Sequence, residues 1–394
     1  MDWIISETKK LEDKLIFLRR ELHKCPEIGG ALPNTLAIVK KYLDEIGISY
    51  KINKDDDSLI AEIKGVNKGK TVAFRADMDA LHITEDTLLP FSSEIEGQMH
   101  GCGHDAHTAI LLIAAEILNN HKDLLNGSVR LLFQSGEETG TGAKQMLKYG
   151  ALDGVDAICA LHVGNIVGDD AKTGDVFVLS GPVTAGKDKF TITVHGKGTH
   201  SAFPEKGIDP ILIAARIVNA CEEISARELP AGTAAVLSFG SFNAGIDHNT
   251  IPDTAIIKGS IRVQNESIRN FMGKRLRDIA ENISSAFNAT CTVEIKKGSA
   301  TVVNDKVMSD LVKTSVEEVL GQDMVKSQFS SALMGSDDFA NYSSIIPGVY
   351  FFLYTNNEEK GITASNHNSK FNVDEDVLWE GVAAYTAIAL KYLS

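Results

Sequence analysis

The sequence predicts an α/β protein with a doubly wound, mainly parallel sheet and a smaller inserted domain. Three observations support this prediction: a length of 394 residues, an alternation of β-rich and helical segments over residues 59–161, and a change of pattern after Gly186. Single hydrophobic cores stop growing at roughly 250–300 residues, so a chain of this length favours two domains. Apolar residues make up 43% of the chain, which is enough for a sizeable core.

The first part of the chain alternates between the two kinds of element. Apolar residues at helical spacing predict a helix over residues 2–24 that ends before Pro26. We then expect strands at 59–63 and 71–74, a helix from about 103 to 118, a strand at 129–133, a helix at 140–148 and a strand at 155–161. This alternation indicates a mainly parallel sheet. Active sites in such sheets lie beyond the carboxyl ends of the strands.

A different order of elements follows Gly186. We expect a strand at 190–195, a helix at 208–223, strands at 235–242 and 254–263, a helix at 268–287 and a strand at 290–295. The order βαββαβ is that of a ferredoxin-like split unit. We therefore expect an inserted domain over residues 185–298 and a discontinuous main domain over residues 1–184 and 299–394. The main domain then continues with a helix at 306–320, a strand at 349–354 and a helix at 374–392.

Charge and cysteine content limit the classes of partner. The chain has 39 basic and 53 acidic residues and a net charge of −14, which argues against nucleic acid and anionic membranes as partners. The cysteines are Cys25, Cys102, Cys159, Cys221 and Cys291. Their odd number and wide spacing predict reduced thiols and a cytoplasmic protein. We expect no signal peptide, and the longest apolar stretch, near residues 109–118, is too short to span a bilayer.

Candidate metal ligands follow predicted strands or begin a helix. Cys102 and His104 are one glycine apart in a loop flanked by Gly101, so both can face the same point. A thiolate can bind one metal or bridge two, and imidazole suits the same metals. His162 ends a predicted strand, and His367 lies in a polar loop before the last helix. Each residue alone has an ordinary structural explanation, but together they predict a metal site.

Two adjacent acids complete this set. Glu137 and Glu138 follow the predicted strand at 129–133 and come directly after a glycine. Adjacent acids are often solvated loop charges. Next to a metal, however, one carboxylate can bind it while the other takes a proton from bound water, whose pKa a divalent ion lowers toward about 7. Our hypothesis makes Glu138 the ligand and Glu137 the base, with two divalent ions that are manganese, zinc, cobalt or nickel.

Four motifs together resemble a known family. They are Leu22-His23-x-x-Pro26-Glu27, Arg75-Ala76-Asp77-Met78-Asp79-Ala80, Gly101-Cys102-Gly103-His104-Asp105 and Gly136-Glu137-Glu138. In this order they resemble the two-metal aminoacylase/carboxypeptidase family, and within it the amidohydrolase branch of hippurate hydrolases, auxin-conjugate hydrolases and N-acyl-amino-acid deacylases. The resemblance runs from about residue 10 to the C-terminus. It implies hydrolysis of an amide next to a carboxylate and a homodimer whose inserted domain is a lid or dimerisation domain.

The resemblance also implies roles for individual residues. The implied metal ligands are Cys102, His104, Glu138, His162 and His367, and Glu137 matches the general base. Asp79 matches an acid that supports the site. Many members of the wider family have a histidine where this chain has Asp77, so the sequence leaves open whether Asp77 binds metal or orients a ligand. His107, one helical turn after His104, is either a residue that supports a ligand or a core residue, and we favour the supporting role.

The inserted domain carries further candidates. Gly198-Thr199-His200-Ser201-Ala202-x-Pro204 resembles the family's lid motif, whose histidine is implied to reach the partner subunit's site and stabilise the tetrahedral oxyanion. Asn249 and Arg262 match positions implied to hold the substrate, and an arginine fork suits a free carboxylate. His200 and Arg262 each have an ordinary alternative, as a loop histidine and as a surface arginine of a strand. The segment Gly335-Ser336-Asp337-Asp338-Phe339 resembles a loop that lines the pocket, and we assign it no catalytic role.

The sequence therefore predicts a metal-dependent amidohydrolase that cleaves N-acyl amino acids, small molecules with an acetyl, benzoyl or similar acyl group. A dipeptidase or carboxypeptidase of the same fold is the main alternative. A thiol hydrolase that uses Cys102 as its nucleophile is another. A non-catalytic metal-binding protein is a further alternative, against which Glu137 argues because it would have no role in binding.

Overall fold

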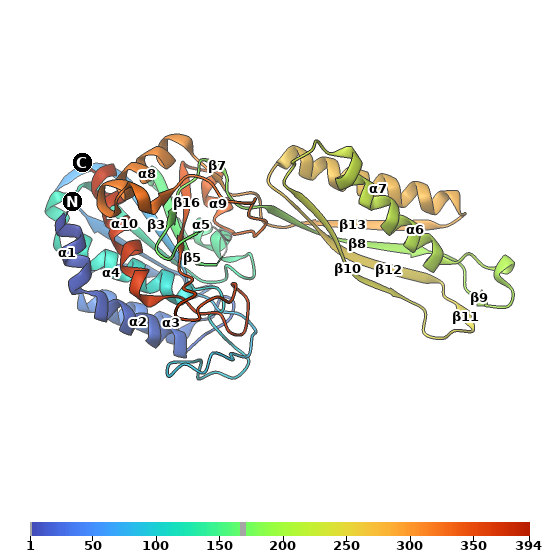
Figure 1. The fold of residues 1–394 in the computed structure, drawn as a ribbon, viewed down its shortest axis with the longest axis horizontal. Helices are drawn as coiled ribbons and strands as arrows, with labels where there is room; N and C mark the ends of the chain where they lie inside the picture. Colours follow the sequence, from blue (N-terminus) through green and yellow to red (C-terminus); the bar gives the residue numbers. More distant parts are fainter. Residues whose placement is uncertain (1, 166–170) are drawn as a thin grey trace. The chain divides into compact units, whose positions relative to one another are not determined.

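The chain forms two compact units in the computed structural model, which describes residues 2–165 and 171–394 (Figure 1). Unit 1 comprises Met1–Val183, Val302–Leu333 and Asp337–Ser394, and unit 2 comprises Thr184–Thr301 and Met334–Ser336. Unit 2 is therefore built from two separate segments of the chain. The second segment, Met334–Ser336, is short and lies within residues 299–394, which we expected to belong wholly to the main domain.

Within the described residues, eight strands form the central sheet of unit 1. They are β1 (Tyr50–Ile52), β2 (Leu59–Lys64), β3 (Asn67–Asp77), β4 (Asn126–Gln134), β5 (Ala157–Gly164), β6 (Val176–Phe177), β15 (Val325–Lys326) and β16 (Gly348–Tyr354). Their order is β1-β2-β4-β3-β5-β16-β6-β15. The central strands β4, β3, β5 and β16 run parallel, whereas β1, β2 and β6 join the sheet through antiparallel pairs. A mainly parallel central sheet is thus confirmed.

Helices cover this sheet. They are α1 (Asp2–Lys10), α2 (Glu12–Lys24), α3 (Pro33–Glu45), α4 (His104–Asn120), α5 (Gly142–Lys148), α8 (Lys306–Leu320), α9 (Ala340–Ser343) and α10 (Leu378–Tyr392), with short 3-10 turns η1 (Lys122–Leu124), η4 (Gln322–Met324) and η5 (Glu375–Val377). Helices α4 and α10 are buried at most positions because they contact both β3 and the outer helices. No described helix is long and apolar enough to cross a membrane.

The single helix expected over residues 2–24 is wrong, since the segment is two helices that meet at Leu11. The two helices bury different surfaces. Ile4 of α1 packs with Val319 and with the outer side of α10, whereas Leu15, Leu18 and Leu22 of α2 join the main core. The apolar spacing is helical throughout, but one straight helix could not reach both surfaces.

The parallel strands bring their carboxyl ends to one edge of the sheet. Strand β3 ends at Asp77, β4 at Gln134 and β5 at Gly164. Every residue of β5 is buried, as expected for a strand covered on both faces. The loops beyond these ends carry the chemically reactive side chains that the sequence indicates.

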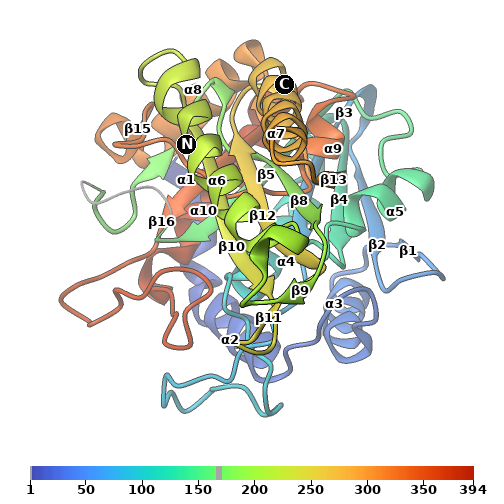
Figure 2. The same ribbon diagram turned by 90° about the vertical axis from the view of Figure 1, so that its right-hand side faces the viewer.

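Unit 2 has its own sheet and core. Its main elements in order are β8 (Gly186–His195), α6 (Pro210–Glu223), β10 (Ala235–Ala244), β12 (Thr254–Val263), α7 (Glu266–Ala286) and β13 (Thr290–Lys297). The strands pair in the order β10-β12-β8-β13 and all neighbours are antiparallel. Helices α6 and α7 lie side by side on one face of this sheet (Figure 2). Their buried side chains pack with those of the strands, so unit 2 has a separate hydrophobic core.

Smaller elements complete the chain. They are β7 (Gly181–Pro182), β9 (Thr199–His200), η2 (Pro204–Lys206), the π-helical turn η3 (Ile224–Glu228), β11 (Thr250–Ile251) and β14 (Val303–Asn304). Strand β7 pairs with β14, and β9 pairs with β11. The β9–β11 pair therefore places the loop after β8 beside the loop before β12.

A buried acid in α10 should make stability depend on pH. Glu380 is 6% exposed, and its Oε2 has no hydrogen-bond partner among the described residues. Gly174, with φ +90°, leaves room for it, because a Cβ there would lie 2.8 Å from Oε2. Burial, partly offset by Lys9 and reinforced by Asp175, raises the pKa of Glu380 to about 8.

We expect Glu380→Gln to raise the melting temperature, by an amount that grows between pH 5 and pH 8. The unfolded chain ionises this carboxyl near pH 4.3, whereas the folded chain keeps its proton until about pH 8. Stability is therefore lost as the pH rises through this window, and glutamine cannot ionise. Thermal unfolding followed by circular dichroism measures the effect. The exposed Glu359→Gln is the matched control, and equal pH dependence of the Glu380 variant and the wild type would contradict the assignment.

Candidate metal centre and active site

Candidate metal-ligand atoms from four segments of unit 1 converge at the carboxyl ends of the parallel strands. The atoms of Cys102, His104 and His162 lie within 4.8 Å of one another, and so do those of Cys102, Glu138 and His367. The two groups share the sulfur of Cys102. One thiolate, three imidazoles and a carboxylate form a donor set that suits divalent transition metals. The structure thus brings together all five ligands that the resemblance implies.

Local backbone geometry places Cys102 and His104. Gly103 adopts φ +89°, and a Cβ there would lie 2.5 Å from Val163 Cγ2, so only glycine fits. His104 begins α4, and its Nδ1 donates a hydrogen bond to the carbonyl oxygen of Asp79 at 2.7 Å. Because a carbonyl can only accept, Nδ1 carries the proton and Nε2 is left available to bind a metal ion.

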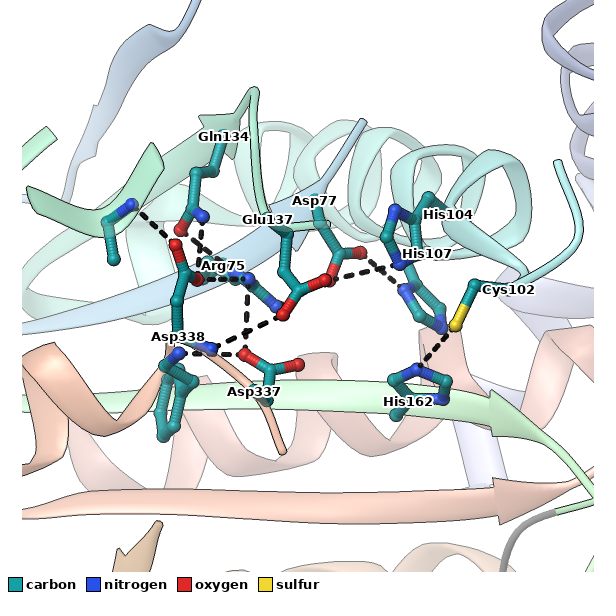
Figure 3. Close-up of polar contacts among 12 residues, drawn as sticks. Arg75, Asp77, Cys102, His104, His107, Gln134, Glu137, His162, Asp337 and Asp338 are labelled. Carbon is teal, nitrogen blue, oxygen red and sulfur yellow. Dashed lines mark hydrogen bonds and ion pairs between the residues drawn. The ribbon is translucent and has the colours of Figure 1, made fainter. Parts of the chain in front are cut away.

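His162 is oriented in the same way. It lies within β5, and its Nδ1 donates to the carbonyl oxygen of Val163 at 2.8 Å. Its Nε2 lies 3.5 Å from Cys102 Sγ (Figure 3). Burial and the neighbouring His107 lower the pKa of His162 well below its ordinary value. A neutral imidazole is the form that binds metal.

His367 is held in an unusual backbone conformation. It adopts φ +67°, which a non-glycine residue keeps only when its surroundings impose it. Its N–H donates to the carbonyl oxygen of Gly101 at 2.7 Å, so the loop that carries it is tied to the Cys102 loop. Its Nε2 faces Glu138 Oε1 at 3.4 Å.

Asn366 joins three of these segments, and the sequence reasoning missed it. Its Nδ2 donates to the carbonyl oxygens of Cys102 at 3.2 Å and Val163 at 3.3 Å. Its Oδ1 accepts from the N–H of Asn165 at 3.1 Å. Its position next to His367 was the one hint in the sequence that Asn366 belongs to the site. Its partners could not be predicted, because Val163 and Cys102 lie 203 and 264 positions away.

The environment of Glu138 fits a bound cation. Its Oε1 is buried and accepts no hydrogen bond from the described residues, although Nε2 of His367 lies 3.4 Å away and Nε2 of His104 lies 3.9 Å away. A buried polar atom without a partner is costly. Glu138 belongs to the group of candidate ligands that also contains Cys102 and His367, and a divalent ion held there would satisfy its unpartnered oxygen.

The pKa values of His104 and His367 also indicate a site that favours positive charge. Burial lowers the pKa of His104, but Asp77 and Asp79 outweigh this effect and raise it well above its ordinary value. Cys102 and Glu138 raise the pKa of His367 to about 10. Both shifts show that the ligand set attracts positive charge. Protons and metal ions compete for such sites.

Asp79 positions both glutamates. Its Oδ1 accepts a hydrogen bond from the N–H of Glu137 at 3.0 Å, and its Oδ2 accepts one from the N–H of Glu138 at 3.1 Å. One buried carboxylate thus fixes the turn that presents the two side chains. Its backbone oxygen also accepts from His104, so Asp79 connects the acids to a histidine ligand.

The contacts of Asp77 favour an orienting role. Its Oδ1 accepts from His107 Nδ1 at 2.5 Å, and its Oδ2 accepts from Arg75 Nη1 at 2.5 Å. His107 Nε2 accepts from the N–H of Val163 at 2.8 Å. Both nitrogens of His107 are engaged in this way, which favours a supporting role for it. The ligand atoms of Asp77, His104 and His107 also lie within 4.8 Å of one another.

Glu137 lies beside a cluster of buried charge. Its Oε1 accepts from the backbone N–H of Asp338 at 3.3 Å. Burial and the carboxylates of Asp337, Asp338 and Glu138 raise its pKa well above the ordinary value. Burial also raises the pKa of Asp338 to about 7. A carboxylate with a raised pKa is a stronger base and suits proton transfer near neutral pH.

The candidate residues of unit 2 lie at two separate places. His200 and Asn249 are exposed and neighbouring, because β9 pairs with β11 and Ser201 N–H donates to the Asn249 carbonyl oxygen. Both lie beyond the Thr254 end of β12. Arg262 is near the other end, and its Nη1 donates to the carbonyl oxygen of Met334 at 2.8 Å. The strand between residues 254 and 262 spans roughly 26 Å, so one unit 2 does not bring all three together.

Comparisons with known proteins show which family this chain resembles. Residues 73–391 match peptidase family M20/M25/M40. The chain is 37% identical to "Thermostable carboxypeptidase 1" of Saccharolobus solfataricus, over 98% of this chain and 97% of that protein. It is also 37% identical to "N-acetyl-L-cysteine deacetylase" of Bacillus subtilis, over 93% and 85%. The crystal structure of the Bacillus subtilis YXEP protein, described as a dinuclear metal binding peptidase, aligns with a TM-score of 0.85 at 32% identity, covering 98% of this chain and 99% of that one.

We expect Cys102→Ser to weaken metal binding by about tenfold or more. Loss of residues that merely support a ligand costs about 10–100-fold in affinity, and a hydroxyl is a poor replacement for a thiolate. Competition with a chelator, followed by elemental analysis, measures the change. Cys291→Ser in unit 2 is the matched control. If the Cys102 variant kept its full metal content and were inactive, a nucleophilic role for Cys102 would explain the data better.

Proposed function

The chain belongs to peptidase family M20/M25/M40, and from this membership we propose that it cleaves the amide bond of N-acyl amino acids, giving a carboxylic acid and a free amino acid. It is a metal-dependent amidohydrolase. One observation supports the proposal most strongly: Glu137 lies next to the five candidate ligand side chains, so its carboxylate is placed to act as a base beside bound metal. Similarity to a deacetylase of N-acetyl-L-cysteine supports the substrate class.

Two divalent ions would be held by Cys102, His104, Glu138, His162 and His367. The solved relative described as a dinuclear metal binding peptidase supports this number. Manganese, zinc, cobalt and nickel all suit the mixed donor set. When bound, such ions polarise the amide carbonyl and lower the pKa of a water molecule toward about 7.

Glu137 would then move the proton. Its carboxylate takes a proton from the attacking water, and the oxygen forms a bond to the amide carbon. The same proton is delivered to the nitrogen as the C–N bond breaks, so the amine leaves neutral and Glu137 is regenerated. Burial and the carboxylates of Asp337 and Asp338 raise the pKa of Glu137. This opposes the lowering that bound divalent ions would cause, so the group can both accept and release a proton. Asp79 holds the backbone of Glu137 in place. The hydrogen bond between His107 and Asp77 would help to orient the residues that bind metal.

We assign the two units different tasks. Residues 1–184 and 299–394 would form the catalytic domain, and residues 185–298 a ferredoxin-like lid and dimerisation domain. The element order and the sheet order of unit 2 support this assignment. Arg262 would bind the substrate carboxylate through its guanidinium fork, and His200 and Asn249 would contact the reacting amide.

The separation within unit 2 supports a homodimer. A single amino-acid substrate is much shorter than the roughly 26 Å between the two ends of β12. Arg262 and the pair of His200 and Asn249 can therefore serve one substrate only if they come from different chains. The five cysteines are all free in the described part of the chain, which supports a cytoplasmic enzyme.

A carboxypeptidase is the second candidate function. The relative named as a thermostable carboxypeptidase is 37% identical over almost the whole of both chains. Both activities cleave an amide next to a free carboxylate, so the same Arg262 would serve either one. They differ only in whether the acyl part is a simple acid or an amino acid.

A substrate panel tests the proposed function. With metal restored, we expect kcat/KM to be highest for N-acetyl, N-benzoyl or longer acyl amino acids with a free carboxylate. Amidated analogues should be about tenfold poorer or worse, because the guanidinium fork of Arg262 would lose its carboxylate partner. Faster cleavage of dipeptides would favour the carboxypeptidase. Absence of hydrolysis with all four metals would contradict both.

Glu137→Gln should keep its metal and lose most of its turnover. A general base contributes about a hundredfold to ten-thousandfold, and glutamine cannot accept the proton. Glu138→Ala is the contrasting variant, because it should lower metal content. Elemental analysis and kcat are measured on both. A nearly normal rate with intact metal content would sink the assignment of Glu137.

A mixed dimer tests whether His200 acts on the neighbouring chain. His200→Ala and Glu137→Gln homodimers should each be inactive. In a mixed dimer, the chain that keeps Glu137 receives its histidine from the partner, so one site of two is complete. Random pairing makes about half of the dimers mixed, and co-expression should restore about a quarter of the wild-type activity. Purified heterodimer without activity would rule out this arrangement.

A further inference from the structure

We propose that Asp338 is a positioning residue that holds the carboxylate of Glu137 in place through its own backbone N–H. The proposal rests on the assignment of Glu137 as the base. The contact itself is the hydrogen bond from Asp338 N to Glu137 Oε1, at 3.3 Å. Asp79 fixes only the main chain of Glu137, so the direction of its side chain depends on contacts of this kind.

The side chain of Asp338 is anchored from three directions. Its Oδ1 accepts from Arg75 Nη2 at 3.0 Å and from Gln134 Nε2 at 2.8 Å. Its Oδ2 accepts from the N–H of Ala143 at 2.8 Å. These partners belong to β3, β4 and α5. The side chain is 1% exposed, so this residue has little freedom to move and its N–H stays aimed at Glu137.

The anchor is itself part of a buried network (Figure 3). Arg75 is 1% exposed, and its Nε donates to Gln134 Oε1 at 3.1 Å. Tyr342 donates to the same oxygen at 2.9 Å. Burying an ion costs several kcal/mol unless good geometry and hydrogen bonds compensate. Apolar residues of similar size often stabilise a protein at least equally, so stability alone does not explain this network. Fixing the position of the Glu137 carboxylate would explain why charged groups are buried here.

The path of the chain explains why an anchor is needed here. Residues Met334–Ser336 belong to unit 2, and the chain enters unit 1 at Asp337. In unit 2, the carbonyl oxygens of Met334 and Gly335 accept hydrogen bonds from Arg262 and from the N–H of Ala185. Asp338 is thus the second residue after a connecting segment. If the carboxylate of Asp338 lost these hydrogen bonds, the position of its N–H would be set by the connecting segment alone.

The test uses the full-length, metal-loaded enzyme with an N-acyl amino acid that it hydrolyses. Asp338→Asn and Asp338→Ala should lower kcat by about tenfold to a hundredfold and leave KM unchanged, as expected for a misplaced base. Metal content should stay at the wild-type value, because Asp338 contacts none of the five ligands. Thr386→Val in α10 is the control: it removes a buried side-chain hydrogen bond outside this network and should keep the wild-type kcat, whatever its effect on melting temperature.

A double-mutant cycle provides the decisive readout. If Asp338 acts through Glu137, adding Asp338→Asn to Glu137→Gln should cause no further loss of kcat. Losses that multiply, a change in KM alone, or loss of metal would overturn the proposal. Failure of both Asp338 variants to fold would also overturn it, since the network would then serve stability. A nearly normal rate for Glu137→Gln alone would instead show that the base is wrongly assigned.

Discussion

The buried guanidinium of Arg75 is the constraint on which the candidate site depends. It is almost fully buried, and it contacts Asp77 on its own strand as well as Asp337 and Asp338 from a distant part of the chain. Such a group is stable only with well-placed partners, so it holds these segments in one arrangement. Through Asp77 it reaches His107 and the ligand side of the site. Through Asp338 it reaches Glu137.

Excess negative charge is the second feature of the site. Glu137, Glu138, Asp77, Asp79 and the Asp337–Asp338 pair surround one arginine and a few histidines. The raised pKa values of Glu137 and His104 show how the chain balances this charge with protons. Divalent ions would displace protons from the ligands, so metal binding and protonation are linked. Glu138 thus has two effects: it would bind metal, and its charge adds to burial and to the charges of Asp337 and Asp338 in raising the pKa of Glu137.

Unit 2 shows how distance constrains the assembly. His200 and Asn249 are kept together by the β9–β11 pair, whereas Arg262 lies near the far end of β12. A rigid strand prevents these residues from approaching one another in a single chain. Their proposed joint action on one small substrate therefore requires symmetry, and a twofold dimer is the simplest assembly that supplies it.

The sequence by itself determined the alternation of strands and helices, and hence the mainly parallel sheet. It also indicated the clustered ligands, because Cys102-Gly103-His104 and Glu137-Glu138 are local motifs that follow or begin regular elements. Apolar periodicity could not show the break at Leu11, since both helices have the same spacing and differ only in what they pack against.

Only the tertiary structure decided the contacts of Asp77, Asn366 and Asp338. Asp338 lies 263 positions from Arg75, and Asn366 lies 264 positions from Cys102. No local pattern links residues so far apart. They meet because parallel strands bring their carboxyl ends to one edge of the sheet, and the hydrogen bonds that fix each side chain form only there.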